Sequence, residues 1–187
     1  ALYQIGYAID NNSTSYDAEV IINGGSVVAS GSYYYDGIRL FANSTTRSNS
    51  VVVNGGEVST IWLQNPSDGA NKNTLDVVAS VEVHGGKVGI LSLEPSANFE
   101  VAVTGGTFTE VSYFQTDASR DVVNFITGGT FTNDPSAFLA EGYHSELVSG
   151  VYTVEVCTLT HVAAVEATCT AEGNVEYWLC STCNTKY

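Results

Sequence analysis

Hydrophobic and polar residues alternate along five segments of the chain, and each segment carries a pair of adjacent glycines. The pattern is clearest in "VVVNGGEVST" (51–60), "VEVHGGKVGI" (81–90) and "VAVTGGTFTE" (101–110), and "IINGGSVVAS" (21–30) and "NFITGGTFTN" (124–133) follow it. An apolar residue at every second position is typical of a β-strand whose alternate side chains face a core. The pattern therefore predicts strands on both sides of each glycine pair.

The glycine pairs recur at a nearly regular interval. They begin at Gly24, Gly55, Gly85, Gly105 and Gly128, so successive pairs lie 31, 30, 20 and 23 residues apart. Repeats of this length that carry strands and no helical periodicity are typical of a solenoid. We therefore predict an all-β fold, a parallel β-helix (β-solenoid) over residues 1–134, with one coil per repeat. A β-sandwich is the alternative, but it needs hairpin turn signals about every 8–12 residues.

The paired glycines are predicted to stand at the corners of the coils. A corner requires either a positive φ or a close approach of neighbouring backbone, and glycine permits both. This structural role is assigned to Gly24, Gly25, Gly55, Gly56, Gly85, Gly86, Gly105, Gly106, Gly128 and Gly129. A phosphate-binding loop is not indicated, because the pairs lack both the motif spacing and the following helix that such a loop needs.

The repetition ends near residue 134. Residues 135–156 contain Pro135 directly after Asp134, the apolar pair Phe138 and Leu139, and the strand-like segments "HSELVS" and "VYTVEV". This order predicts a short helix or turn followed by two strands. We expect the segment to be a cap and connector, because the end of a solenoid otherwise exposes its core.

All four cysteines lie in a third segment, residues 157–187, as Cys157, Cys169, Cys180 and Cys183. So short a segment buries little core, and a crosslink is expected. The Cys180-x-x-Cys183 pair is typical of a structural zinc site, which Cys157 and Cys169 complete unless His161 replaces one thiolate. Two disulfides are the alternative in an oxidising compartment. We favour one zinc, and redox catalysis by "CSTC" is a weaker third hypothesis.

Two stretches near the C-terminal end resemble modules of known surface proteins. "GGTFTNDPSAFLAEGYHSELVSGVYTV" is similar to a recurrent element of large secreted surface proteins of gut-dwelling Gram-positive bacteria, and "LTHVAAVEATCTAEGNVEYWLCSTCNTKY" is similar to the small Cys-containing modules that follow it there. The resemblance covers residues 125–187 and implies an extracellular or cell-surface location without implying an activity. Histidine often replaces Cys157 in such modules, as a metal ligand would allow, and Asn184 stands where glycine is expected.

Composition narrows the range of partners. Only 6 basic residues stand against 20 acidic ones, so the net charge is −14. Such a surface repels phosphate backbones, and no nucleic-acid partner is expected. The apolar stretches are a few residues long, so no segment of this chain is expected to insert into a membrane.

Catalysis is not predicted, and no catalytic or cofactor-binding residue is assigned. Carbohydrate-active β-helices need clustered acids with a basic residue, or two facing carboxylates. The acidic candidates are scattered, with Arg120 near two of them: Glu57, Glu82, Glu94, Glu100, Glu110, Asp117 and Asp121. The histidines do not suggest a Ser-His-Asp set. His84, which precedes a glycine pair, is expected to form hydrogen bonds at a corner.

Aromatic residues indicate a binding surface. "SYYYDG" (32–37), Trp62, Tyr113 and Phe114 are candidates for a platform that contacts a glycan or a protein. The function predicted is a non-catalytic structural or adhesive module of a bacterial surface protein. Its partner is this chain itself, stacked end to end through "ALYQIGYAID" (1–10), or a host or bacterial glycan or protein. A glycan-binding domain is the alternative, and a carbohydrate-active enzyme is a weaker one.

Overall fold

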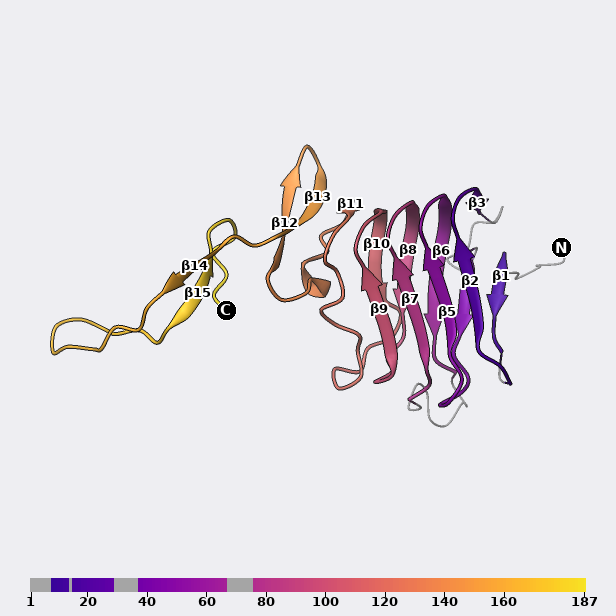
Figure 1. Ribbon diagram of the computed structural model, residues 1–187, viewed down its shortest axis with the longest axis horizontal. Coiled ribbons are helices and arrows are strands. Elements are labelled where there is room, and N and C mark those ends of the chain that lie inside the picture. The colour runs from indigo at the N-terminus through magenta and orange to yellow at the C-terminus, as the bar shows by residue number, and fades with distance from the viewer. Residues whose placement is uncertain (1–7, 14, 29–36, 67–75) are drawn as a thin grey trace.

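The described part of the chain consists almost entirely of strands and turns. The computed structural model describes residues 8–13, 15–28, 37–66 and 76–187 (Figure 1). The nine strands of the largest sheet are β1 (Ile9–Asn11), β3 (Ser26–Val27), β4 (Ile38–Phe41), β6 (Glu57–Gln64), β8 (Lys87–Leu93), β10 (Thr107–Tyr113), β11 (Thr130–Phe131), β12 (Tyr143–Val148) and β13 (Val151–Val156). A four-stranded sheet contains β2 (Ala18–Ile22), β5 (Asn49–Val53), β7 (Ala79–Val83) and β9 (Phe99–Val103).

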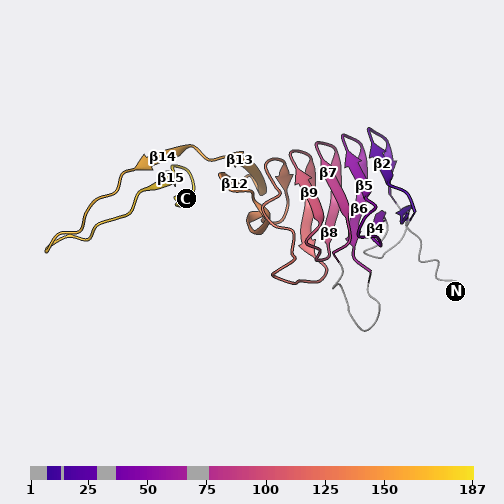
Figure 2. The same ribbon diagram turned by 60° about the horizontal axis from the view of Figure 1, so that its bottom comes forward.

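Strands of equivalent repeats pair in parallel. In the four-stranded sheet the order is β2-β5-β7-β9, and in the largest sheet β4, β6, β8 and β10 follow one another in the same direction. Figure 2 shows the two series side by side, with their turns aligned at the same end. The predicted all-β class is confirmed, and its sheets are parallel through this part of the chain.

Rows of apolar side chains run across both sheets, because the register stays in phase from one repeat to the next. Val53, Val83 and Val103 are partners in one such row, and all three are fully buried. The facing row in the largest sheet consists of Val58, Val88, Phe108 and Phe131. Because burial stabilises each large apolar side chain by about 1.5–3 kcal/mol, these rows are the main source of stability.

The glycine pairs meet two structural requirements. The second glycine has a positive φ in all five pairs, as in Gly86 at 83°. From the second pair onward both glycines also lie against the backbone of the preceding repeat: a Cβ on Gly105 would stand 2.4 Å from the carbonyl oxygen of His84, and one on Gly86 would stand 2.8 Å from that of Gly56. The pairs therefore stack directly on one another, and side chains there would push the repeats apart.

The parallel arrangement ends at the segment 135–156. A 3-10 helix (Ser136–Phe138) follows Pro135, and the hairpin β12–β13 then joins the largest sheet through an antiparallel pairing of β13 with β11. The Phe138 ring contacts Tyr113 and Phe125, with centroid distances of 5.0 and 5.5 Å. The sequence predicted a short helix or turn followed by two strands, and the structure has a 3-10 helix and the two strands β12 and β13, with the Phe138 side chain buried.

Residues 157–187 extend away from the sheets as a narrow unit (Figure 1). Its strands β14 (Leu159–Val162) and β15 (Tyr177–Cys180) form a two-stranded antiparallel sheet. Within residues 158–187, Cys180 is the only buried residue. A two-stranded sheet without a core is marginally stable alone, so this unit depends on other contacts. Over the described residues, no helix has the length and apolar character needed to cross a membrane.

Candidate metal centre

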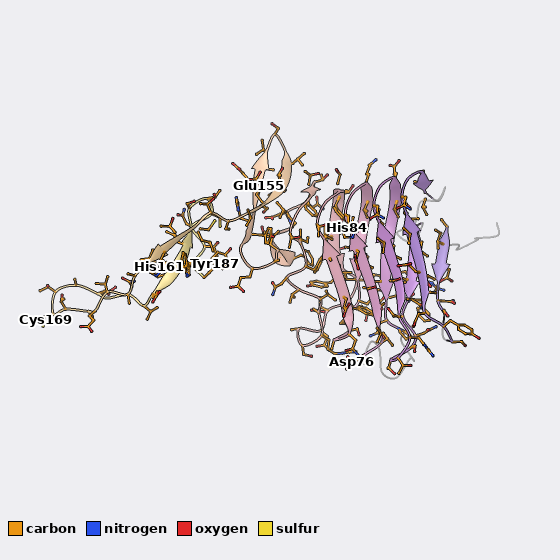
Figure 3. All side chains as sticks on the ribbon, viewed as in Figure 1. Asp76, His84, Glu155, His161, Cys169 and Tyr187 are labelled. Carbon is orange, nitrogen blue, oxygen red and sulfur yellow. The ribbon has the colours of Figure 1, made fainter. Side chains whose placement is uncertain are left out.

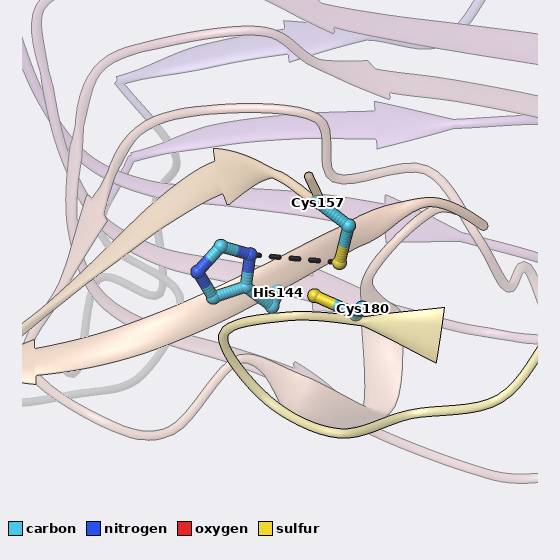
Figure 4. A group of neighbouring side chains, drawn as sticks. All are labelled: His144, Cys157 and Cys180. Atoms are coloured by element: carbon cyan, nitrogen blue, oxygen red, sulfur yellow. Dashed lines mark hydrogen bonds between the residues drawn. The ribbon is translucent and has the colours of Figure 1, made fainter. Parts of the chain in front are cut away.

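Three buried side chains from separate elements meet where the hairpin β12–β13 contacts the C-terminal unit (Figure 4). His144 lies on β12, Cys157 follows β13 directly, and Cys180 ends β15. Their ligand atoms lie within 4.8 Å of one another, and His144 Nδ1 is 3.6 Å from Cys157 Sγ. Imidazole nitrogen and thiolate sulfur are common ligands of zinc and other transition metals. This group can therefore hold a metal ion.

Backbone pairing brings these three residues together. The Cys157 amide donates to the Gly142 carbonyl over 2.7 Å, which places Cys157 beside the start of β12 and close to His144. Two residues later, Leu159 pairs with Cys180 in the β14–β15 sheet. The turn into β14 thus brings Cys180, which lies far away in sequence, to the same point.

The pKa values of the two buried thiols are shifted in opposite directions. Burial raises the pKa of Cys180, but hydrogen bonds from the Cys157 thiol and from the backbone amides of Cys183 and Thr182 outweigh it, so the net effect lowers the pKa. The pKa of Cys157 is raised by burial and by its hydrogen bond to Cys180. Cys180 is therefore the sulfur that most readily carries the negative charge a metal ligand needs.

Not all of the sequence-predicted ligands meet in this group. Cys183 is exposed, lines the same hollow as His144 and Tyr187, and its Sγ lies 3.1 Å from Thr185 Oγ1. Cys169 is exposed at the far tip of the C-terminal unit, away from the other cysteines (Figure 3). His161 lies 2.7 Å from Glu176 and against the Trp178 ring.

Sequence reasoning did not assign a ligand role to His144, which the structure places in the group. The available signal was a histidine in the predicted strand "HSELVS", thirteen residues before Cys157. All four cysteines are free thiols in this structure. The structure thus brings together Cys157 and Cys180 of the predicted set, and adds a histidine from outside the C-terminal unit.

A second hollow lies on the outer face of β6, β8 and β10. It is lined by Trp62, Ile90, Ser92, Glu110, Ser112, Tyr113 and Phe114. The Trp62 and Phe114 rings are 5.4 Å apart; Trp62 is buried and Phe114 is 47 % exposed. Of the predicted aromatic segment 32–37, residues 32–36 lie outside the described residues. The hollow is therefore lined by three aromatic side chains, Trp62, Tyr113 and Phe114, beside the single carboxylate of Glu110.

Several acidic candidates have local structural partners. Glu57 forms an ion pair with Lys87 over 2.7 Å, and Glu82 lies 3.1 Å from His84. The other ring nitrogen of His84 is 2.9 Å from Thr104 Oγ1 in the next repeat, so the predicted corner hydrogen bond is confirmed. Glu57, Glu82 and His84 therefore form contacts within a repeat or between neighbouring repeats.

Glu94 is the exception among the acids because it is buried, with 3 % of its surface exposed. It accepts the Asn65 amide over 3.0 Å and a hydrogen bond from Trp62, but burial dominates and raises its pKa to about 7. In the unfolded chain its pKa is near 4.5. Between these two pH values Glu94 keeps its proton in the folded protein but has lost it in the unfolded chain. The free energy of unfolding therefore decreases as the pH rises from 4.5 to 7.

We expect the free energy of unfolding to fall by about 3 kcal/mol between pH 4.5 and pH 7 because of Glu94. Urea unfolding across this range measures the change. Glu94→Gln should flatten the profile, whereas Glu100→Gln, which removes an exposed carboxylate, should leave the step in place. Equal pH dependence in the two variants would contradict the assignment.

Comparison of the chain with protein-family models, curated proteins and solved structures found no match.

Proposed function

We propose that this chain is a β-solenoid module of an extracellular bacterial surface protein, with a structural or adhesive role and no catalysis of its own. The observation that carries the proposal is the in-phase stacking of parallel strands, with each glycine pair packed on the one before. Stacked repeats of this kind form extended scaffolds with long binding faces. The surface location rests on the resemblance of residues 125–187 and on the acidic composition.

The ends of the described sheets support assembly with further copies. β1 and β2 are the terminal strands at one end of their sheets, and each pairs with a described strand on one side only. A terminal strand offers backbone donors and acceptors to another chain. Ile21 on β2 is 50 % exposed and adds an apolar contact there. Of the predicted pairing segment 1–10, residues 1–7 lie outside the described residues.

We expect the protein to associate end to end as its concentration rises, as measured by sedimentation velocity and negative-stain electron microscopy. Ile21→Lys places a charge on the terminal strand and should weaken association at least about tenfold, because edge charges oppose strand pairing. Val123→Lys is the matched control, since Val123 is 53 % exposed but lies outside the terminal strands. A chain that stays monomeric at every concentration would contradict filament formation.

The C-terminal unit is proposed to bind one structural zinc. The buried histidine and two cysteines support a transition metal, and thiolate ligands favour zinc over calcium or magnesium. A metal would also supply the stability that the small, exposed two-stranded sheet lacks.

Glycan binding is the second candidate function, and the hollow beside Phe114 favours it. Aromatic side chains next to a polar rim are typical of sugar-binding surfaces. The hollow contains one carboxylate, Glu110, whereas a glycosidase needs two facing ones. A monomeric protein that binds soluble polysaccharide, and loses that binding in Phe114→Ala, would favour this function over self-assembly.

A further inference from the structure

We infer that a zinc ion bound by His144, Cys157, Cys180 and Cys183 fastens the C-terminal unit to the hairpin β12–β13. This inference rests on the zinc proposed above and adds which residues bind the ion and what the ion joins. It replaces Cys169 of the sequence-predicted set with a histidine from outside the C-terminal unit. The site is then a joint between two parts of the chain.

The spacing of the three buried ligands matches a tetrahedral zinc site. With Zn–S bonds of about 2.3 Å and Zn–N bonds of about 2.0–2.1 Å, a nitrogen and a sulfur ligand stand about 3.5 Å apart. His144 Nδ1 and Cys157 Sγ are 3.6 Å apart, and all three ligand atoms lie within 4.8 Å of one another. The protein thus holds these side chains at metal-binding distances through its own backbone pairing.

Cys183 is placed to supply the fourth ligand. Its backbone amide and its side chain both form hydrogen bonds with the Cys180 sulfur, so the two cysteines of the Cys-x-x-Cys loop are neighbours. Cys183 also lines the hollow that His144 borders. Its Sγ is held 3.1 Å from Thr185 Oγ1 and is not among the three ligand atoms that lie within 4.8 Å of one another, so Cys183 joins the site only when it gives up the contact to Thr185. A closed set of three thiolates and one imidazole is typical of structural zinc.

The surroundings of His144 are consistent with a ligand role for Nδ1. The ring is buried, and its Nε2 has no hydrogen-bond partner among the described residues. Nδ1 faces Cys157 Sγ at 3.6 Å, so in the neutral tautomer that is protonated at Nε2 the Nδ1 lone pair is directed toward the site. A Cys157–Cys180 disulfide, in contrast, would leave this buried imidazole without a role.

The C-terminal unit needs such a joint. Val165, Val175 and Trp178 are all exposed, so the unit leaves its large apolar side chains unburied and gains little stability from apolar packing. When zinc binds residues of both the hairpin and the C-terminal unit, the free energy of metal binding stabilises the docked and ordered state of the unit. Cys169 and His161 lie on the unit away from the joint and have no part in it.

The test uses the full chain, reduced and loaded with zinc or cobalt. We expect one metal per chain, and cobalt spectra with the d–d bands of a tetrahedral site and thiolate charge transfer. His144→Ala and Cys180→Ser should weaken zinc affinity more than about 100-fold, since even loss of an outer-shell partner costs 10–100-fold. Cys169→Ser and His161→Ala are the matched controls and should bind zinc as the unsubstituted chain does.

Hydrogen exchange of the unsubstituted chain provides a readout that does not depend on the folding of any variant. A chelator should remove protection from β14 and β15 and leave β7 protected. If metal binding requires Cys169 and tolerates His144→Ala, the inference is wrong while the proposed zinc stands. If the reduced chain binds no metal, both the inference and the proposed zinc are wrong. Protein purified without reductant that has no free thiols when denatured then contains disulfides instead.

Discussion

Gly105→Ala is expected to lower the free energy of unfolding by about 3 kcal/mol, because overpacked sites must displace their neighbours. The added Cβ would stand 2.4 Å from the His84 carbonyl oxygen, which belongs to the backbone of the preceding repeat. Relief requires the two repeats to separate. Gly86→Ala should cost about 4 kcal/mol, because it adds a positive φ of 83° to a similar clash.

The first glycine pair supplies matched controls measured in the same urea titration. At Gly24 the added Cβ meets no described atom within 4 Å and φ is not positive, so alanine should not destabilise the protein. Gly25 has equal space but a φ of 77°, so Gly25→Ala isolates the cost of the left-handed backbone, about 1–2 kcal/mol. Equal losses at all four positions would show that stacking of the glycine pairs does not determine stability.

Phe108→Ala is expected to cost about 3–5 kcal/mol, the range for truncation of a large core side chain. Phe108 is 1 % exposed, and its ring stacks on Phe131 of the next repeat with a centroid distance of 4.9 Å. The cavity cannot collapse easily, because paired backbones hold the repeats on both sides. Thermal unfolding followed by circular dichroism measures the loss.

Phe114→Ala is the matched control for this truncation. The same side chain is removed, but the Phe114 ring is half exposed and lies 5.4 Å from the Trp62 ring on the outer face of the sheet. We expect a loss of about 1 kcal/mol, the scale of one aromatic pair. Hydrogen exchange in Phe108→Ala should increase first in β10, β11 and β13. Comparable losses in the two variants would contradict the assignment of Phe108 to the central core row.

The strands and the repeat could be predicted because their cause is local. Alternation of apolar residues around "VNGG", "VHGG" and "VTGG" indicates which side chains face inward, and the recurring glycine pair marks the same point in each repeat. The two roles of the glycines were predicted as alternatives, and the structure gives positive φ to the second glycine of each pair and close packing to both glycines from the second pair onward.

The metal site could be predicted only in part, because its ligands come from different elements. Cys180 and Cys183 are close in sequence, and their spacing alone indicates a metal loop. His144 lies on β12, and no spacing rule connects it to Cys180; antiparallel pairing in β12–β13 and in β14–β15 brings them together. Cys169 fits the composition of a four-cysteine site, but its loop extends away from the others.

The sequence by itself therefore determined the strand-rich class, the phase of the repeats, the cap elements and the existence of a cysteine-rich end. Each follows from short-range periodicity or from the limited core available to a short segment. Tertiary structure decided that Glu94 is buried, that an aromatic hollow forms over β6, β8 and β10, and that His144 joins two cysteines. These features depend on which strands become neighbours, and burial and ligand geometry exist only after that pairing is made.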